Sequence, residues 1–406
     1  MAPLSSLSRF IPIVALVCAA LLWTTPVDAQ IGPVQLFDGT VRIAGEASVT
    51  VGERDYDAFF NYTDYERNAL RTVRLSGTLL WQPAPVIAFV AEVRTDDFDQ
   101  LTASALYVRV RPWRSVPLDI QAGRIPPVFG AYGRQAYEAN RMLIGHPLGY
   151  QYLTSLRPDA IPADAGDLLR MRGRGWLSSF PIGSPEPAPG VPLVSAFRWD
   201  TGVEARWRFG RTDAAVAVTQ GTLANPLLVD DNGRPQLSGR IATQVTPGLR
   251  VGISAARGRF IADDVPRGDR PGGDQTSFGA DAEYSTGRWL LRGEVIWTEW
   301  SIPYVTVPPE GPRISARAAW IEGRYRLTPR LYVAARADAL GFSHVTGRSP
   351  AERRDTWDAN VGRIEAGAGY SLLRHLMVRG IVQFNDRDGG RVTERTFVSS
   401  QVSWWF

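Results

Sequence analysis

The feature that most constrains the fold is an alternation of period two that recurs along most of the chain. In one segment, Leu331, Val333 and Ala335 share one parity, whereas Arg336 and Asp338 fall on the other. Successive side chains of a strand point to opposite faces, so such a segment is a strand with one apolar and one polar face. The sequence therefore predicts an all-β chain.

Sixteen segments follow this pattern, and they account for most of the chain. They are residues 41–51, 72–81, 86–94, 105–111, 118–124, 198–209, 214–220, 236–245, 249–256, 278–284, 289–297, 318–327, 331–338, 361–372, 376–385 and 396–406. The sequence has no internal repeat, and no linker divides it into two halves, so we expect one domain over residues 30–406.

The connections between these segments alternate between short and long. The short turns are 82–85, 112–117, 210–213, 246–248, 285–288, 328–330 and 373–375; the longer loops are 52–71, 95–104, 125–197, 221–235, 257–277, 298–317, 339–360 and 386–395. An even number of strands with short turns on one rim and long loops on the other is typical of a transmembrane β-barrel. We therefore expect a closed antiparallel barrel of about 16 strands, with periplasmic turns and outer loops, in the bacterial outer membrane.

The two parities of the strands differ in chemistry. The outward parity is apolar in mid-strand and carries aromatic residues near the short-turn ends: Trp81, Phe209, Tyr284, Trp289, Tyr325, Tyr370, Trp404 and Phe406. Aromatic rings of this kind form the girdle of a membrane barrel at the lipid headgroups. A soluble sandwich has no reason to place its aromatics at one rim.

The N-terminus is typical of a secretory signal peptide. Arg9 precedes an apolar run, and the small residues Val27 and Ala29 stand before an expected cut ahead of Gln30. Cys18, the one cysteine of the sequence, lies in this segment. With residues 1–29 removed, the expected mature chain has no cysteine for a disulfide, a thiolate nucleophile or a metal ligand.

The C-terminus carries a family resemblance. Val402, Trp404 and Phe406 share one parity, and the chain ends on Phe406. This resembles the last strand of bacterial outer-membrane proteins, which implies that Trp404 and Phe406 serve as a signal to the barrel-assembly machinery. The chain also resembles the 16-stranded porins in length and loop rhythm. The stretch Gly123–Gly130 is weakly similar to the phosphate-selective porins, although that group uses lysines and this chain has none.

Charged residues on the inward parity indicate a water-filled lumen with a surplus of arginine. All 45 basic residues of the chain are arginines, and by parity 16 of them face inward against 11 acids. An arginine surplus favours anions in a pore, although cross-strand pairs with acids that only brace the wall are the alternative. The expected pore-lining residues include Arg74, Arg94, Arg109, Arg111, Arg206, Arg208, Arg292, Arg336 and Arg363.

The third long connection, of roughly 70 residues, is expected to be functional, because loops of this length are usually active-site lids or binding loops. In porins the loop at this place in the order commonly folds inward and narrows the channel. Arg170, Arg172 and Arg174, followed by Trp176, are the candidate constriction, since guanidinium groups bind carboxylates and phosphates. The alternative is a solvated loop that braces the rim. Asp164 is a candidate N-cap for a short helix over residues 164–170.

Signals for catalysis or metal binding are weak. His146, His344 and His375 lie on different connections, and no catalytic or metal-binding motif is present. We expect no enzyme activity, no catalytic or metal site, no cofactor and no nucleic-acid partner. The expected function is passive diffusion of small polar solutes, with anions preferred. The alternatives are a non-conducting adhesin or structural anchor and an outer-membrane hydrolase. The expected partners are membrane lipid, the assembly machinery and further copies in a homotrimer.

Overall fold

The computed structural model describes residues 33–55, 59–63, 67–113, 115–175, 177–196, 198–266, 272–307, 311–347 and 354–406. The expected signal peptide, residues 1–29, lies outside them. The chain from Pro33 to Phe406 is one compact unit. Among the residues described, no helix is long and apolar enough to cross a bilayer.

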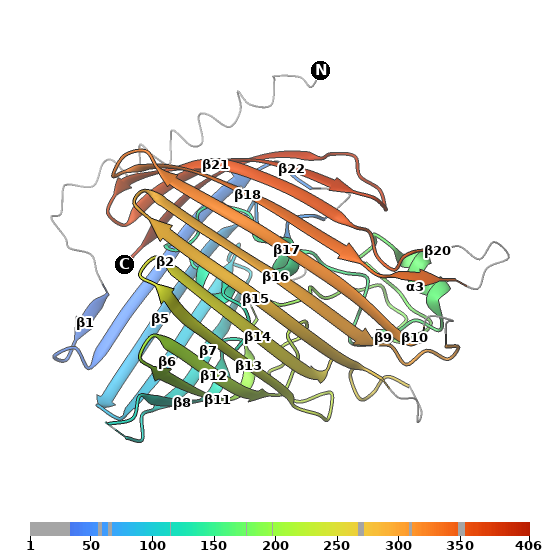
Figure 1. Ribbon diagram of the computed structural model, residues 1–406, viewed down its shortest axis with the longest axis horizontal. Helices are drawn as coiled ribbons and strands as arrows, with labels where there is room; N and C mark the ends of the chain where they lie inside the picture. Colours follow the sequence, from blue (N-terminus) through green and yellow to red (C-terminus); the bar gives the residue numbers. More distant parts are fainter. Residues whose placement is uncertain are drawn as a thin grey trace, which may run out of the picture. The chain divides into compact units, whose positions relative to one another are not determined.

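Sixteen antiparallel strands close into a barrel, as the alternation predicts (Figure 1). They are β2 (Val41–Gly52), β5 (Val73–Ala84), β6 (Ile87–Asp96), β7 (Gln100–Val110), β8 (Leu118–Ile125), β11 (Asp200–Phe209), β12 (Thr212–Thr219), β13 (Gln236–Thr246), β14 (Leu249–Arg259), β15 (Asp274–Thr286), β16 (Trp289–Ser301), β17 (Arg313–Arg326), β18 (Leu331–Phe342), β21 (Val361–Leu373), β22 (Leu376–Arg387) and β23 (Thr396–Trp405). Each pairs with the next, and β23 returns to pair with β2. Closure leaves no unpaired strand edge in lipid.

The remaining elements are short. They are the strands β1 (Val34–Leu36), β3 (Tyr62–Thr63), β4 (Arg67–Asn68), β9 (Ala160–Ile161), β10 (Ile182–Gly183), β19 (His344–Thr346) and β20 (Arg354–Thr356), and the helices η1 (Tyr132–Gln135), α2 (Leu148–Gln151) and α3 (Ala165–Met171). β1 adds to the edge of β2, and β3–β4, β9–β10 and β19–β20 are two-stranded pairs in the longer connections. The N-cap of α3 is Asp164, as predicted; its side chain accepts hydrogen bonds from the N–H groups of Gly166 and Asp167.

The two faces of the wall have the expected chemistry. In β18, Arg336 is 2% exposed and Asp338 is 6% exposed, whereas Val333, on the opposite parity of the same strand, is 41% exposed. Aromatic rings gather at the short-turn ends: Trp289 and Tyr325 lie 4.7 Å apart, measured between ring centroids. The outer wall is therefore an apolar band bordered by an aromatic girdle, as lipid requires.

The second long loop predicted from the sequence is instead a tight turn. β6 extends to Asp96 and β7 starts at Gln100, so only Asp97, Phe98 and Asp99 connect them. The register shifts by one residue near Glu92, and this bulge moves the part of β7 before Ala105 to the opposite parity. The change of parity hides the start of β7 from a simple period-two pattern. The other predicted strands match the observed ones apart from their ends.

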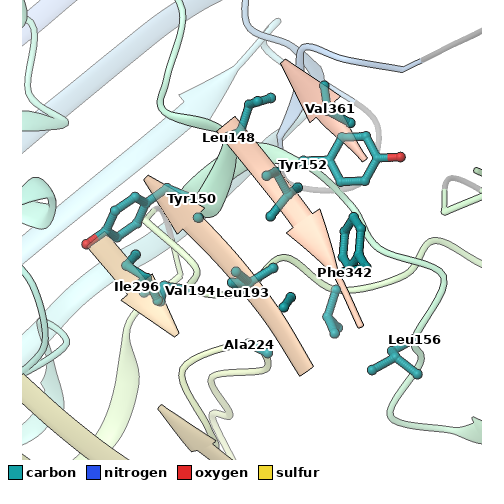
Figure 2. Packing of buried hydrophobic residues seen from close by; sticks show 14 of the residues in the cluster. Leu148, Tyr150, Tyr152, Leu156, Leu193, Val194, Ala224, Ile296, Phe342 and Val361 are labelled. Carbon is teal, nitrogen blue, oxygen red and sulfur yellow. The ribbon is translucent and has the colours of Figure 1, made fainter. Parts of the chain in front are cut away.

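The apolar core of the protein lies inside the barrel and is built around the third long connection. Buried residues of this connection, among them Leu148, Tyr150 and Tyr152, pack beside Ile296 and Phe342 of the wall (Figure 2). Most residues from 141 to 156 are buried. The third connection therefore fills much of the lumen instead of covering its mouth.

The barrel closes at a glycine that receives the terminal ring. The N–H of Gly45 donates to the carbonyl of Phe406 at 3.2 Å, and the N–H of Phe406 donates back at 3.0 Å. A Cβ on Gly45 would lie 2.6 Å from a ring carbon of Phe406. Gly380 is a matched glycine on β22, where a Cβ meets nothing within 4 Å.

We expect Gly45→Val to displace the Phe406 ring and weaken the β2–β23 seam by about 1–3 kcal/mol. The measurement is the temperature at which the fast-migrating folded band of unheated detergent samples converts to the slow band on a gel. Gly45→Val should convert at a temperature several degrees below the parent, whereas Gly380→Val should convert with the parent. Equal conversion temperatures for the two variants would contradict this role of Phe406.

Candidate functional site

Residues 129–152 of the third connection, here called the transverse segment, cross the lumen and are bonded to distant parts of the wall. The Gly130 N–H donates to Ser254 Oγ of β14 at 3.0 Å, and Gly145 N–H donates to Glu365 Oε1 of β21 at 2.9 Å. Between these points, Tyr137 Oη donates to Glu92 Oε2 of β6 at 3.0 Å. A segment tied to β6, β14 and β21 spans the barrel from one side to another.

Glu138 and Arg379 form the central anchor of the transverse segment. Arg379 of β22 donates to the Glu138 carboxylate at 3.1 Å and to the carbonyl of Arg141 at 3.2 Å. Arg141 contacts the same carboxylate, and Ser48 of β2 donates to it at 3.2 Å. Glu138 and Arg379 are each 1% exposed, and charges this deeply buried are stable only when paired and hydrogen-bonded. The pair therefore holds this part of the segment against β2 and β22.

Two more wall arginines hold the segment through its carbonyl groups. Arg336 donates to the Gly145 carbonyl at 3.0 Å and to carboxylates of β17, β18 and β21 at 2.7–3.3 Å. Arg363 donates to the His146 carbonyl at 3.1 Å and to the Phe60 carbonyl at 2.6 Å. Both guanidinium groups thus donate to buried backbone oxygens, which need hydrogen-bond partners inside the protein.

His146 is a structural residue of the same segment. It has no exposed surface, and Arg141 donates to its Nε2 at 3.0 Å. Because arginine only donates, Nε2 is an acceptor and Nδ1 carries the proton toward the Tyr132 hydroxyl. Burial lowers the pKa of His146 well below its ordinary value. The ring is therefore neutral and closed to substrate at neutral pH.

Two cavities remain beside the transverse segment, on the side of the lumen formed by β5–β8 and β11–β14. A cavity of about 160 Å³ lies against β11–β14, and one of about 40 Å³ lies against β5–β7. Both are lined by Gly133, Tyr137 and Trp199, so they adjoin one another. The smaller one holds only a few waters at about 15 Å³ each. We call the two together the side path.

Arginines and acids line the side path. Its lining includes Arg74, Arg94, Arg206, Arg240 and Arg250, together with Glu46, Glu92 and Asp213. Each of these arginines forms an ion pair with a wall carboxylate: Asp96 for the first two, and Glu204, Asp281 and Asp213 for the others. The walls of the path therefore combine cross-strand ion pairs with apolar residues such as Pro127, Val128 and Phe129, and the charged pairs can contact a hydrated solute.

The arginine triad of the third connection does not line the side path. Arg170 lies at the end of α3 with a half-exposed side chain 3.2 Å from Asp167. Arg172 donates to Thr356 Oγ1 at 3.0 Å and to Asp388 Oδ1 at 2.6 Å, and so ties the third connection to two outer loops. Arg174 is exposed, and Trp176 lies outside the described residues. In the part of the chain that the structure describes, the segment that crosses the lumen is residues 129–152, not this triad.

The arginines expected to line the pore lie in several different settings. Arg336 and Arg363 are buried under the transverse segment, so they do not meet open water. Arg74, Arg94 and Arg206 line the side path, while Arg111 and Arg208 pair with acids near the periplasmic ends of their strands. Arg109 and Arg292 complete the set; Arg292 pairs with Glu283 at 2.8 Å and donates to the Asn140 carbonyl at 3.2 Å.

The residues that sequence reasoning missed are those of the transverse segment, together with Trp199, which directly precedes β11. Gly133, Tyr137, Glu138 and Trp199 position or line the side path, yet none belongs to a recognisable motif. The available signal was composition: Tyr132, Tyr137, Tyr150 and Tyr152 lie within about twenty residues of a connection expected to be an outer loop. Aromatic residues this dense are unusual in a solvated loop and indicate burial.

Comparisons with known proteins are limited to structure. No family model matches the chain, and no curated protein sequence matches it. Among solved structures, the anion-selective porin of Comamonas acidovorans superposes with a TM-score of 0.55 at 13% identity, over 90% of this chain and 99% of that one. OmpF of Salmonella typhi gives 0.56 at 13% identity over 92% and 100%. The outer-membrane channel DcaP of Acinetobacter baumannii gives 0.54 at 10% identity over 93% and 100%.

A loop L8 deletion mutant of OmpT, an outer membrane protein of Vibrio cholerae, is similar to the same degree, with a TM-score of 0.54 at 11% identity over 90% of this chain and 99% of that one. The identities are too low to transfer residue roles or activity. The likeness covers nearly the whole of each chain, and it agrees with the strand count, the closure and the lipid-facing band observed here. The chain thus has the fold of the porin-like barrels of the bacterial outer membrane.

Proposed function

We propose that the protein is an outer-membrane channel for small polar solutes, and that solutes pass along the side path. The observation that carries the proposal is the adjoining pair of arginine-lined cavities between the transverse segment and the wall of β5–β14. A non-conducting anchor has no need of a hydrated, arginine-lined space inside a closed wall. The path is narrow, so the resting conductance is small, and movement of the transverse segment sets how often the path is open.

A modest preference for anions is part of the proposal. Arg74 and Arg94 share the one carboxylate of Asp96, at 2.8 and 2.6 Å, so this trio keeps one positive charge. Glu92 lies close by and accepts a hydrogen bond from Ser104 at 2.7 Å. The local field at this end of the path is therefore a balance between a cationic trio and one nearby acid.

A second trio with the same surplus stands at the periplasmic end. Arg208 and Arg250 share Asp213, at 2.8 and 2.6 Å. Between the trios, Arg206 pairs with its own acid, Glu204, at 2.6 Å and adds no net charge. An anion meets a surplus cation at the periplasmic end, whereas Glu46 and Glu92 offset the surplus of the Asp96 trio at the other end. This supports anion entry but predicts weaker selectivity than the inward surplus of the whole wall implies.

The non-conducting alternative has one observation in its favour: the transverse segment is fixed by buried ion pairs and carbonyl contacts at Arg336, Arg363 and Arg379. The hydrolase alternative has less structural support. His146 is buried, and within the described residues no cluster of His, Cys, Asp and Glu is arranged to hold a metal ion. His344 is exposed on β19, and no carboxylate is among the described residues that line the hollow beside it.

Two partners also belong to the proposal. The terminal residues Trp404 and Phe406 are proposed as the signal to the barrel-assembly machinery, which is consistent with the position of Phe406 at the closing seam. A homotrimer is proposed by analogy. One structure of OmpT from Vibrio cholerae is of a trimer form, with a TM-score of 0.52 at 10% identity, 90% coverage of this chain and 99% of that one.

The selectivity proposal is tested at the Asp96 trio by two substitutions of opposite sign. Arg94→Gln removes the surplus cation and should lower the anion-to-cation permeability ratio, whereas Asp96→Asn should raise it, each by about twofold at 0.1 M salt, where the Debye length is about 10 Å. The measurement is the reversal potential across a planar bilayer under a KCl gradient. At about 1 M salt the differences should fade.

Arg330→Gln serves as the control for these charge substitutions. Arg330 is exposed in the turn between β17 and β18, away from the side path, so its removal should leave the ratio at the parent value. If the two Asp96-trio variants shift the ratio in the same direction, or not at all, the solute path does not run beside this trio.

The gating proposal is tested at the central anchor. Arg379→Met removes the donor that holds Glu138 and two loop carbonyls, so the transverse segment should leave the wall more often. Single-channel recording should show openings at least about twofold larger or more frequent, because a buried charge that loses its partner is strongly destabilised. Glu138→Gln, which keeps the shape of the side chain, should act in the same direction.

The control is Arg374→Gln, a substitution of an exposed arginine in the turn between β21 and β22. The variants are compared only as folded samples, identified by the fast-migrating band of unheated protein. Folded Arg379→Met and Glu138→Gln barrels with parental conductance would show that the transverse segment does not gate the path. A parent and variants that all remain silent would favour the non-conducting anchor.

A further inference from the structure

A hollow of about 1110 Å³ lies on the outer wall of the barrel, toward the ends of β15–β18 that lead into the long loops. These strands form the face turned toward the viewer in Figure 1, and β20 lies beyond their outer ends. The side path inside the barrel shares none of the residues that line this hollow. It is therefore a separate feature of the lipid-facing surface.

The floor of the hollow is a row of small apolar side chains across four strands. Ala280 of β15 pairs with Val295 of β16, which pairs with Ala319 of β17, which pairs with Ala339 of β18. Large outward side chains cover most of the band elsewhere, so three alanines in register leave a trough in the wall. An acyl chain fits such a trough without displacing a side chain.

The next row toward the outer rim is aromatic and cationic. Phe278 pairs with Trp297, Trp297 with Arg317, and Arg317 with Gly341, and the rings of Phe278 and Trp297 are stacked 5.7 Å apart. Arg317 lies eight residues before the girdle residue Tyr325 on β17. That spacing corresponds to about 20 Å along the membrane normal for a tilted strand, within an apolar band about 25 Å tall. The Cα of Arg317 therefore lies near the outer edge of the apolar band, from where a long arginine side chain can reach the headgroups of the outer leaflet.

Above this row the hollow is bordered by Arg354 of β20 and His344 of β19, both exposed. Among the residues that the structure describes, the side chains of Arg317 and Arg354 have no hydrogen-bonding or ion-pairing partner, and no carboxylate lines the hollow. The nearest outward acid along these strands, Glu299, is held by Arg313 at 3.1 Å. An arginine on a lipid-facing wall without a protein partner is costly unless lipid supplies the counter-charge.

We propose that this hollow binds a lipid of the outer leaflet that carries an anionic phosphate headgroup. The two guanidinium forks take the phosphate oxygens, and an acyl chain lies in the trough of Ala280, Val295, Ala319 and Ala339. A second copy of the chain is a poorer occupant, because a protein surface facing these cations would need an acidic patch at the same membrane level. The inference rests on the membrane fold and not on conduction through the side path.

The test is native mass spectrometry of the full barrel in detergent with phosphatidylglycerol and phosphatidylcholine of identical acyl chains. The parent should retain phosphatidylglycerol with an affinity about tenfold or more above phosphatidylcholine, the difference expected for two arginines near a phosphate. Arg317→Gln with Arg354→Gln should reduce that ratio to within about twofold. Arg391→Gln, an exposed arginine of the loop between β22 and β23, is the matched control and should keep the parental ratio.

A second variant separates the trough from the headgroup site. Ala319→Trp fills the floor without changing charge, so retention of both lipids should fall together. Equal retention of the two lipids by the parent, or undiminished phosphatidylglycerol retention in the double arginine variant, would overturn the proposal. If the double variant instead loses a chain–chain complex while keeping the lipid ratio, the hollow is a contact between copies, and the lipid proposal fails.

Discussion

The structure depends on the requirement that every backbone N–H and C=O group in lipid has a partner within the protein. A β-chain meets this requirement only by closing, and here β23 returns to β2 so that the sheet has no free edge within the band. Closure brings the terminal residue Phe406 against Gly45, where the absence of a side chain leaves room for the ring. The pairing of the first and last strands thus fixes the size of the lumen and the position of everything inside it.

A lumen enclosed by 16 strands is too wide for wall side chains alone to fill, and this barrel fills it with its own third connection. Filling a polar cylinder with chain carries an electrostatic cost, because carbonyl groups and acids of the connection leave water. Arg336, Arg363 and Arg379 meet this cost by donating to those carbonyls from the wall. The arginines that form part of an inward surplus in the sequence therefore act in part as structural ligands for the loop.

Arginine has three different roles in the barrel, which depend on its distance from the barrel axis. Buried arginines under the transverse segment hold backbone oxygens, and arginines of the side path share acids such as Asp96 and Asp213. Arg317 on the outer wall has no hydrogen-bonding or ion-pairing partner among the described residues, and we propose that a lipid phosphate supplies one. Guanidinium groups suit all three settings because they remain charged and present several donors in a plane. A replacement of arginine by lysine would not be equivalent at the buried sites, where one group serves several acceptors.

The sequence by itself determined the wall. A two-residue period specifies which side chains face lipid, so strands, faces, girdle and strand number followed from residues such as Val333 and Arg336 without a structure. It failed at β7, where one bulged residue inverts the parity, and in the third connection, where no period exists. Whether Arg172 faced water or Asp388, and whether Arg363 lined a pore or held the His146 carbonyl, was decided only by the tertiary structure. The physical reason is that strand alternation is a local property of the chain, whereas the partners of a buried charge lie hundreds of residues away and are brought together only by closure and by the inward folding of one loop.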